Sequence, residues 1–201
     1  MPEFLFAEAF SLWGSPATWF ELVAVVLALV MVGCNIREIH WGWPLAAISS
    51  VMYFMLFWRS RIYGDAALQV SFAVLALWGW AQWLRGVRPD GSALKVARLS
   101  RRGLLLVVAA CALLWPAIGL FLKTFTDTDV PWWDAFPTAA SLVGQFLLGR
   151  KYIENWAVWV VVNIASVGLF AYKGLWLTVG LYAVFIVLSV AGWRAWRARL
   201  A

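Results

Sequence analysis

Polar side chains recur at helical spacing inside two strongly apolar segments of the chain. Steps of three and four residues place each set on one face of a helix. Amides both donate and accept hydrogen bonds, and indole faces stack on rings and attract cations, so the two sets together suit a planar polar ring. The sets are Asp134, Thr138, Ser141 and Gln145 in the first segment, and Trp156, Trp159, Asn163 and Ser166 in the second.

Other apolar segments carry shorter stripes of the same kind. They are Ser50 and Tyr53, then Asp65, Gln69 and Phe72, and then Thr178, Tyr182 and Phe185. Such residues either face a cavity or form hydrogen bonds that hold helices together, each worth about 0.6 to 2 kcal/mol. For Gln145, Asn163 and the tryptophan pair we favour ligand contact. Both interpretations stay open for Ser50, Ser141, Ser166 and Thr178.

The composition predicts that membrane helices carry these stripes. The chain is 64% hydrophobic and 13% charged, with a mean hydropathy of +0.82, which is typical of integral membrane proteins. Its apolar runs are continuous and lack the alternation of barrel strands, so the predicted class is all-α. Sixteen tryptophans exceed what an interfacial belt needs, which suggests that some line an aromatic cavity. Seven spans are predicted, at residues 19–36, 43–58, 65–83, 103–121, 132–148, 155–171 and 175–193.

One stretch of the chain occurs twice. Residues 43–83 align without a gap on residues 156–196, at a constant offset of 113. Both copies end on the same signature, Gly79-Trp80-Ala-Gln-Trp83 and Gly192-Trp193-Arg-Ala-Trp196. Together with the span before it, each copy makes a group of three helices, at residues 19–83 and 132–196, and a single helix between the groups restores a common orientation. We therefore predict seven transmembrane helices in a 3+1+3 bundle with parallel three-helix repeats, as in SWEET-type transporters, and a small membrane transporter as the working hypothesis.

The predicted organisation has five parts. They are an interfacial amphipathic helix at 1–18, the first three-helix repeat at 19–83, a basic cytoplasmic linker with the inserted fourth helix at 84–131, the second repeat at 132–196, and a cytoplasmic tail at 197–201.

Lysine and arginine residues are divided unevenly between the two sides of the predicted bundle. The positive-inside rule makes the richer side cytoplasmic, so the N-terminus is expected outside and the C-terminus inside. The net charge of +6 then reflects topology and contact with the lipid bilayer, and no nucleic-acid partner is expected. The richer side holds Arg37, Arg85, Arg88, Lys95, Arg98, Arg101, Arg102, Arg150, Lys151, Arg194, Arg197 and Arg199, and the other side holds Arg59, Arg61, Lys123 and Lys173.

Residues suited to other chemistry are few. Cys34 and Cys111 lie within apolar spans and are expected to pack as small hydrophobic residues. His40 is the only histidine, and one histidine cannot build a metal site of ordinary ligand count. The sequence has no Walker A motif and no evident nucleophile–base pair. We therefore expect no cofactor, no metal and no enzymatic activity.

Several runs of residues are similar to those of a known family. They are the run from Thr138 to Trp159, then Asn163 and Tyr172-Lys173-Gly174-Leu175, and in the first half Trp43-Pro44, Tyr53, Arg61-Ile-Tyr63-Gly-Asp65 and Leu68-Gln69-Val-Ser-Phe72. These runs give the chain, from residue 19 to residue 196, a resemblance to the PnuC-type vitamin transporters. It implies a 3+1+3 bundle, a homotrimer, a bacterial inner (plasma) membrane location, and a binding region at the W-x-x-W of the sixth span. It also implies facilitated diffusion of nicotinamide riboside, made one-way by a cytoplasmic kinase that phosphorylates the vitamin. Thiamine or riboflavin is the alternative substrate within the family.

The stripes and the resemblance together predict one substrate site. Nicotinamide riboside and thiamine are both flat cations, which indole faces attract by roughly 0.5 to 2 kcal/mol. A retinal-binding receptor is disfavoured because the last span contains no lysine, and a membrane scaffold without transport is the distant alternative. The predicted binding residues are Trp156, Trp159, Asn163, Gln145, Gln69, Tyr53, Tyr182, Ser141, Thr138 and Trp43.

Overall fold

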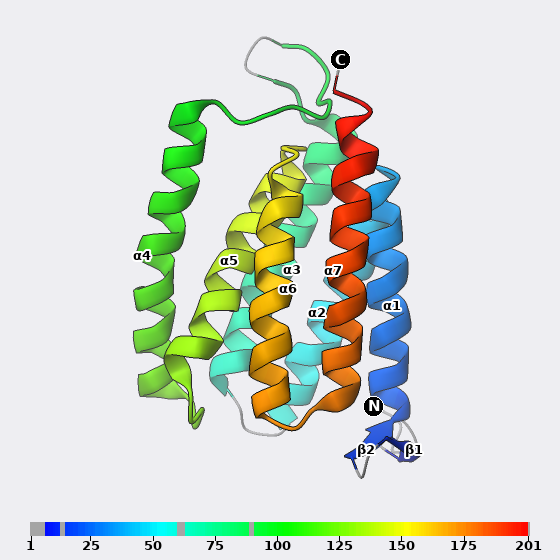
Figure 1. Cartoon of the computed structure of the whole chain (residues 1–201), viewed down its shortest axis with the longest axis vertical. Helices are drawn as coiled ribbons and strands as arrows, with labels where there is room; N and C mark the ends of the chain where they lie inside the picture. Colours follow the sequence, from blue (N-terminus) through cyan, green and yellow to red (C-terminus); the bar gives the residue numbers. More distant parts are fainter. Residues whose placement is uncertain (1–6, 13–14, 60–62, 89–90, 201) are drawn as a thin grey trace.

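Seven long helices dominate the fold of the chain (Figure 1). The structure is a computed structural model, and it describes residues 7–12, 15–59, 63–88 and 91–200. Every predicted span lies on one of these helices, so the predicted all-helical class and the seven helices are confirmed for the described residues. The helices are α1 (Trp19–Ile36), α2 (Gly42–Arg59), α3 (Tyr63–Arg85), α4 (Arg101–Phe125), α5 (Pro131–Gly149), α6 (Asn155–Tyr172) and α7 (Trp176–Arg197).

Several helices match the dimensions of a membrane. Within the described residues, four are long and apolar enough to span one, at Ala66–Arg85, Arg101–Phe125, Asn155–Tyr172 and Trp176–Arg197. Shorter apolar helices run over Leu22–Ile36 and Gly42–Met55. The helix α5 is not in either group, because it carries the polar stripe of Asp134, Thr138, Ser141 and Gln145. It packs against α3, α4 and α6, so its polar face lies within the protein.

The N-terminal segment corrects one prediction. In place of an amphipathic helix over residues 1–18, strands β1 (Glu8–Leu12) and β2 (Ser15–Thr18) form an antiparallel hairpin, while residues 1–6 and 13–14 lie outside the described residues. Pro16 explains the difference, since proline lacks a backbone N–H and disfavours the helical conformation at the residue before it. Helix formation therefore begins after this proline, at Trp19.

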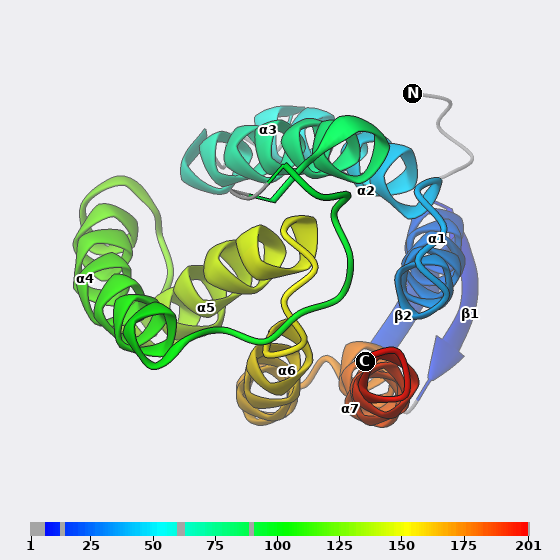
Figure 2. The same cartoon turned by 90° about the horizontal axis from the view of Figure 1, so that it is seen from above.

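Six of the helices form a closed ring, and α4 stands outside it (Figure 2). Within each half, neighbouring helices pack in chain order, α1 on α2 on α3 and α5 on α6 on α7. The halves meet twice, where α3 packs on α5 and where α7 packs on α1. Each junction joins the third helix of one half to the first helix of the other.

Four helices, α1, α3, α5 and α7, finish at the same end of the bundle, at the top of Figure 1. We call this the basic end, because Arg85, Arg150, Lys151, Arg194 and Arg197 stand there. Residues 91–100, which precede α4, cross this end as a strap. The backbone of Ala97 in that strap donates to the carbonyl of Lys151 at 3.0 Å and accepts from the N–H of Ile153 at 2.9 Å.

The duplicated signature packs in the same way in both halves. The ring of Trp43 lies so close to Gly79 that a Cβ there would stand 2.2 Å from it. The ring of Trp156 lies against Gly192, where the corresponding distance is 2.6 Å. Each of these rings also meets the last tryptophan of its own half edge to face, with centroids 5.5 Å apart in both cases. The two glycines are therefore required by close approach of an indole.

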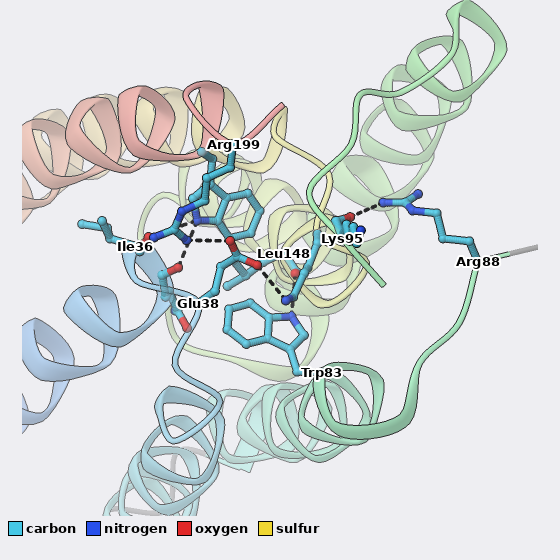
Figure 3. Close-up of polar contacts among 10 residues, drawn as sticks. Ile36, Glu38, Trp83, Arg88, Lys95, Leu148 and Arg199 are labelled. Atoms are coloured by element: carbon cyan, nitrogen blue, oxygen red, sulfur yellow. Dashed lines mark hydrogen bonds and ion pairs between the residues drawn. The ribbon is translucent and has the colours of Figure 1, made fainter. Parts of the chain in front are cut away.

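The two halves hold each other through reciprocal hydrogen bonds at the basic end. The indole N–H of Trp83 donates to the carbonyl of Leu148 at 3.1 Å (Figure 3), and that of Trp196 donates to the carbonyl of Asn35 at 3.2 Å. Both the donors and the acceptors are related by the offset of 113 residues. Each third helix is thus tied to the end of the other half's first helix.

An ion pair joins the turns that follow these first helices. Glu38 and Lys151 are also 113 residues apart, and both adopt positive φ, 57° and 55°. Lys151 Nζ lies 2.7 Å from one oxygen of Glu38, and Arg199 Nη1 lies 2.5 Å from the other (Figure 3). Burial raises the pKa of the Glu38 carboxyl, but the hydrogen bonds and charges of Lys151 and Arg199 outweigh burial, so its pKa falls below the usual value.

Candidate binding cavity

A central cavity of about 740 Å³ lies inside the ring. All six ring helices contribute to its wall, and α4 does not. Along α1 the lining runs from Phe20, near the opposite end, to Asn35, at the basic end. The volume is within the range of roughly 300 to 1,000 Å³ that is usual for small-molecule sites.

Most of the predicted binding residues meet at this cavity. Helical periodicity brought the α7 stripe and part of the α5 and α6 stripes to the cavity, as expected for steps of three and four, whereas Asp134, Thr138 and Ser166 are not among the lining residues. Whether they contact a ligand stays a prediction. The predicted residues that line the cavity are Trp156, Trp159, Asn163, Gln145, Gln69, Tyr53, Tyr182 and Ser141.

Two predicted residues do not line the cavity. Thr138 is absent from its wall and donates its hydroxyl to the backbone carbonyl of Asp134 at 2.9 Å, within α5. Trp43 is only 1% exposed and packs on Gly79, behind the cavity wall. Its counterpart Trp156 is 2% exposed and packs on Gly192, so it is both a lining residue and part of the scaffold.

The structure adds residues that sequence reasoning missed. Ser189 is buried and accepts a hydrogen bond from Asn163 Nδ2 at 3.2 Å. It stands four residues after Phe185 on the α7 stripe, so continuing the periodicity would have found it. Asn35 also lines the cavity, and its buried Oδ1 has no hydrogen-bond partner within the described residues. No periodic signal marked Asn35, since it stands alone at the end of α1.

The cavity has a polar part and an aromatic part. Gln145, Asn163 and Trp159 lie in the half nearer the basic end, and the Trp159 ring rests on Gly144, where a Cβ would be 3.4 Å away. Toward the opposite end, Phe20 meets Tyr53 edge to face at 5.4 Å between ring centroids. Tyr182 lies between Phe170, at 5.1 Å, and Phe185, at 5.6 Å.

None of the described lining residues carries a formal charge. Their hydrogen-bonding groups are amides, hydroxyls and indole N–H groups, which donate to or accept from neutral polar ligands. Aromatic faces attract a cation without a counter-charge, whereas a phosphate calls for arginine, lysine or several backbone N–H groups. The wall therefore suits a flat heterocycle with hydroxyl or amide groups better than a phosphorylated one.

The polar groups come mainly from the second half of the chain. Ser141 and Gln145 on α5 correspond to Ala28 and Val32 on α1, which line the opposite wall. At these two positions the α5 side of the cavity is polar where the α1 side is apolar, while Asn35, Tyr53 and Gln69 add polar groups from the first half.

Within the described residues, no group of three or more histidine, cysteine, aspartate or glutamate side chains is placed to hold a metal ion.

A ring of apolar helices around an uncharged, aromatic cavity is typical of a multi-pass membrane protein with a cavity between its two halves. Within that class, the chain belongs to the nicotinamide mononucleotide transporter family, which matches residues 18–198. This match confirms the resemblance to PnuC-type transporters. The family is one of membrane transporters, and the two relatives compared below are bacterial proteins.

The names of individual relatives mention two vitamins, riboflavin and nicotinamide riboside. The riboflavin/roseoflavin transporter RibM of Streptomyces davaonensis is 28% identical and aligns with 94% of this chain and 90% of its own length. The nicotinamide riboside transporter PnuC of Escherichia coli is 25% identical over 91% of this chain and 87% of its own. The crystal structure of the vitamin B3 transporter PnuC has the same fold, with a TM-score of 0.72 at 24% identity, over 90% of this chain and 82% of that one.

Proposed function

We propose that the chain transports nicotinamide riboside across the bacterial inner membrane. The observation that carries the proposal is the uncharged cavity, with an indole and two amides on one wall and aromatic rings toward the opposite end. A pyridinium ring can stack on Trp159 without a counter-charge, while Gln145 and Asn163 can pair with a carboxamide or ribose hydroxyls. The name of the Escherichia coli relative supports this choice.

Riboflavin is the second candidate. The relative named for riboflavin is 28% identical, against 25% for the relative named for nicotinamide riboside. Riboflavin is a flat and neutral ring with a polyhydroxyl chain, and a wall without charge accommodates it as well. Thiamine, a flat cation, is the third candidate. The phosphorylated nucleotide for which the family is named is less suited, since no lysine or arginine is among the described lining residues.

Transport is proposed to be facilitated diffusion through parallel three-helix repeats arranged as in SWEET transporters. No carboxylate is among the described lining residues, which favours a mechanism without proton coupling. A cytoplasmic kinase would then trap the vitamin by phosphorylation. The N-terminus is proposed to lie outside and the C-terminus in the cytoplasm, because the basic end would face the cytoplasm. The functional unit is proposed to be a homotrimer.

Titration calorimetry on the purified protein tests the substrate. Nicotinamide riboside is expected to bind, with riboflavin, thiamine and nicotinamide mononucleotide as competitors. Trp159→Ala is expected to weaken binding about tenfold or more, on the scale of about 1 to 3 kcal/mol for a lost stacking ring. Asn163→Leu is expected to cost about 1 to 3 kcal/mol by leaving a ligand group unpaired. Trp41→Ala is the control, since Trp41 is 60% exposed and does not line the cavity.

The outcomes separate the alternatives. If Trp159→Ala and Asn163→Leu stay folded and bind nicotinamide riboside as tightly as the parent protein does, the site lies elsewhere. Tighter binding of riboflavin than of nicotinamide riboside would change the substrate and leave the site unaltered.

Liposome uptake tests the mechanism. Nicotinamide riboside is expected to equilibrate across the membrane and not to accumulate. Accumulation driven by a proton or sodium gradient without any kinase would contradict facilitated diffusion.

A reporter fused to the C-terminus tests the proposed topology. Reporter activity only outside the cell would contradict it.

A further inference from the structure

A second hollow lies outside the ring, between α3, α4 and α5. Its volume is about 810 Å³, and it is separate from the central cavity because the two share no lining residue. The helix α4 packs chiefly on α5 and only weakly on α3, which leaves this space open on the surface of the bundle. Apolar side chains such as Val74, Val107 and Phe146 form most of its wall.

The hollow is about as long as one leaflet of a bilayer is thick. Its α4 wall runs along one helical face from Gly103 through Val107 and Ala110 to Leu114. The eleven steps from Gly103 to Leu114 rise about 16 Å along the helix axis. The hydrocarbon core of a bilayer is about 30 Å thick, so the groove covers roughly half of it. A groove of this length fits an acyl chain from one leaflet better than a helix that crosses the membrane.

The groove ends on a cationic group at the basic end. Arg150 and Tyr152 line it there, next to the start of α4, where Arg101 and Arg102 are exposed. Arg150 donates to Gln82 Oε1 at 2.6 Å and makes two longer contacts, 3.4 and 3.5 Å, to the carbonyl of Val87. A guanidinium has five N–H groups, so these contacts leave donors for a phosphate.

We propose that this groove binds an anionic phospholipid of the leaflet at the basic end. One acyl chain lies along α4 between α3 and α5, and the headgroup phosphate accepts hydrogen bonds from Arg150. Charge complementarity selects the anionic lipid, because basic pockets between membrane helices attract anionic headgroups. The length of the groove selects a lipid rather than a helix of a second copy.

Native mass spectrometry of the protein released from lipid nanodiscs tests the proposal. Nanodiscs of equal parts phosphatidylglycerol and phosphatidylcholine are expected to yield protein that retains phosphatidylglycerol in preference. Arg150→Gln is expected to lower this preference about fivefold, since one arginine near the surface contributes about 1 kcal/mol. Arg194→Gln is the matched control, because Arg194 is exposed at the same end and lies outside the groove.

Filling the groove tests the acyl chain separately. Ala110→Trp is expected to lower retained phosphatidylglycerol about tenfold, because an indole would displace at least two methylenes from the groove. Ala109→Trp, one residue away on α4 and exposed, is expected to leave it unchanged. If Ala110→Trp yields no folded protein, Val107→Phe tests the same groove with a smaller increase in side-chain volume.

Three results would overturn the proposal. They are equal retention of the two lipids by the parent, equal loss in Ala110→Trp and Ala109→Trp, and a change of oligomeric state in Ala110→Trp, which would make the groove an interface between copies.

Discussion

Equivalent positions in the two halves behave differently in two regions of the molecule. At the basic end the equivalent positions 83 and 196 are both tryptophan, and each indole N–H donates to a backbone carbonyl of the other half. In the cavity, Gln145 stands opposite its counterpart Val32, and Trp159 corresponds to Ala46. A contact across a two-fold arrangement needs the same residue from both halves, whereas an asymmetric ligand needs different ones. The positions that differ between the halves are therefore the better candidates for recognition.

The largest expected effect is on the shared scaffold. Gly192→Ala would place a Cβ 2.6 Å from the Trp156 ring, and Gly79→Ala would place one 2.2 Å from the Trp43 ring. Each variant is expected to lose about 2 to 3 kcal/mol of unfolding free energy, or about 5 to 10 °C in Tm. Gly180→Ala, also in α7, has nothing within 4 Å and serves as control. A Gly192→Ala protein that melts like the parent would break the equivalence of the two halves.

The next effect concerns the cavity. Gln145→Val installs the residue of the first half and is expected to weaken nicotinamide riboside binding about tenfold by leaving a ligand group unpaired. Val32→Ala, at the equivalent position, is expected to change binding far less. Titration calorimetry measures both, and thermal melting confirms that each variant is folded. Equal effects of the two variants would mean that the two walls contribute alike.

A smaller effect is expected at the ion pair between the halves. Because the pKa of Glu38 is lowered in the folded protein, its pairing stabilises the protein above the unfolded pKa of about 4.3 and is lost as the pH falls below it. Glu38→Gln is expected to cost about 1 kcal/mol, or about 2 to 4 °C in Tm, at pH 7.

Thermal melting between pH 7 and pH 3 checks the sign of this effect. The difference between Glu38→Gln and the parent should shrink below about pH 4.3. Asp127→Asn, an exposed carboxyl near the opposite end, is the control. A difference that grows toward acid pH would contradict the role of the pair.

The smallest effect separates scaffold from ligand contact in two equivalent tryptophans. The indole N–H groups of Trp43 and Trp156 are both buried without a hydrogen-bond partner among the described residues, but only Trp156 lines the cavity. Trp43→Phe and Trp156→Phe should lower Tm by similar amounts. Only Trp156→Phe should weaken ligand binding, by about threefold. If Trp43→Phe and Trp156→Phe bind the ligand with equal affinity, Trp156 contributes to packing and not to ligand binding.

The helices and much of the polar part of the cavity wall could be predicted because both follow from local periodicity. Apolar runs define the helices, and steps of three and four bring Ser141, Gln145 and Asn163 to one face. Periodicity assigns a face and not a depth, so it does not indicate that Trp43 and Thr138 are absent from the cavity lining. The hairpin of β1 and β2 depends on a single proline, Pro16. The hydrogen bonds of Trp83 and Trp196 depend on contacts between segments that are distant in the sequence, and no local pattern predicts such contacts.

The paired turns at Glu38 and Lys151 carry information about ancestry. Both turns keep the left-handed backbone that side chains other than glycine seldom adopt, although one residue is acidic and the other basic. In a symmetric dimer of identical half-chains, a position that meets its own copy would bring two like charges together. The pair of opposite charges at 2.7 Å is available only when the halves are free to differ in sequence. Joining two halves in one gene permits that freedom, and with it an ion pair between equivalent positions that identical subunits could not form.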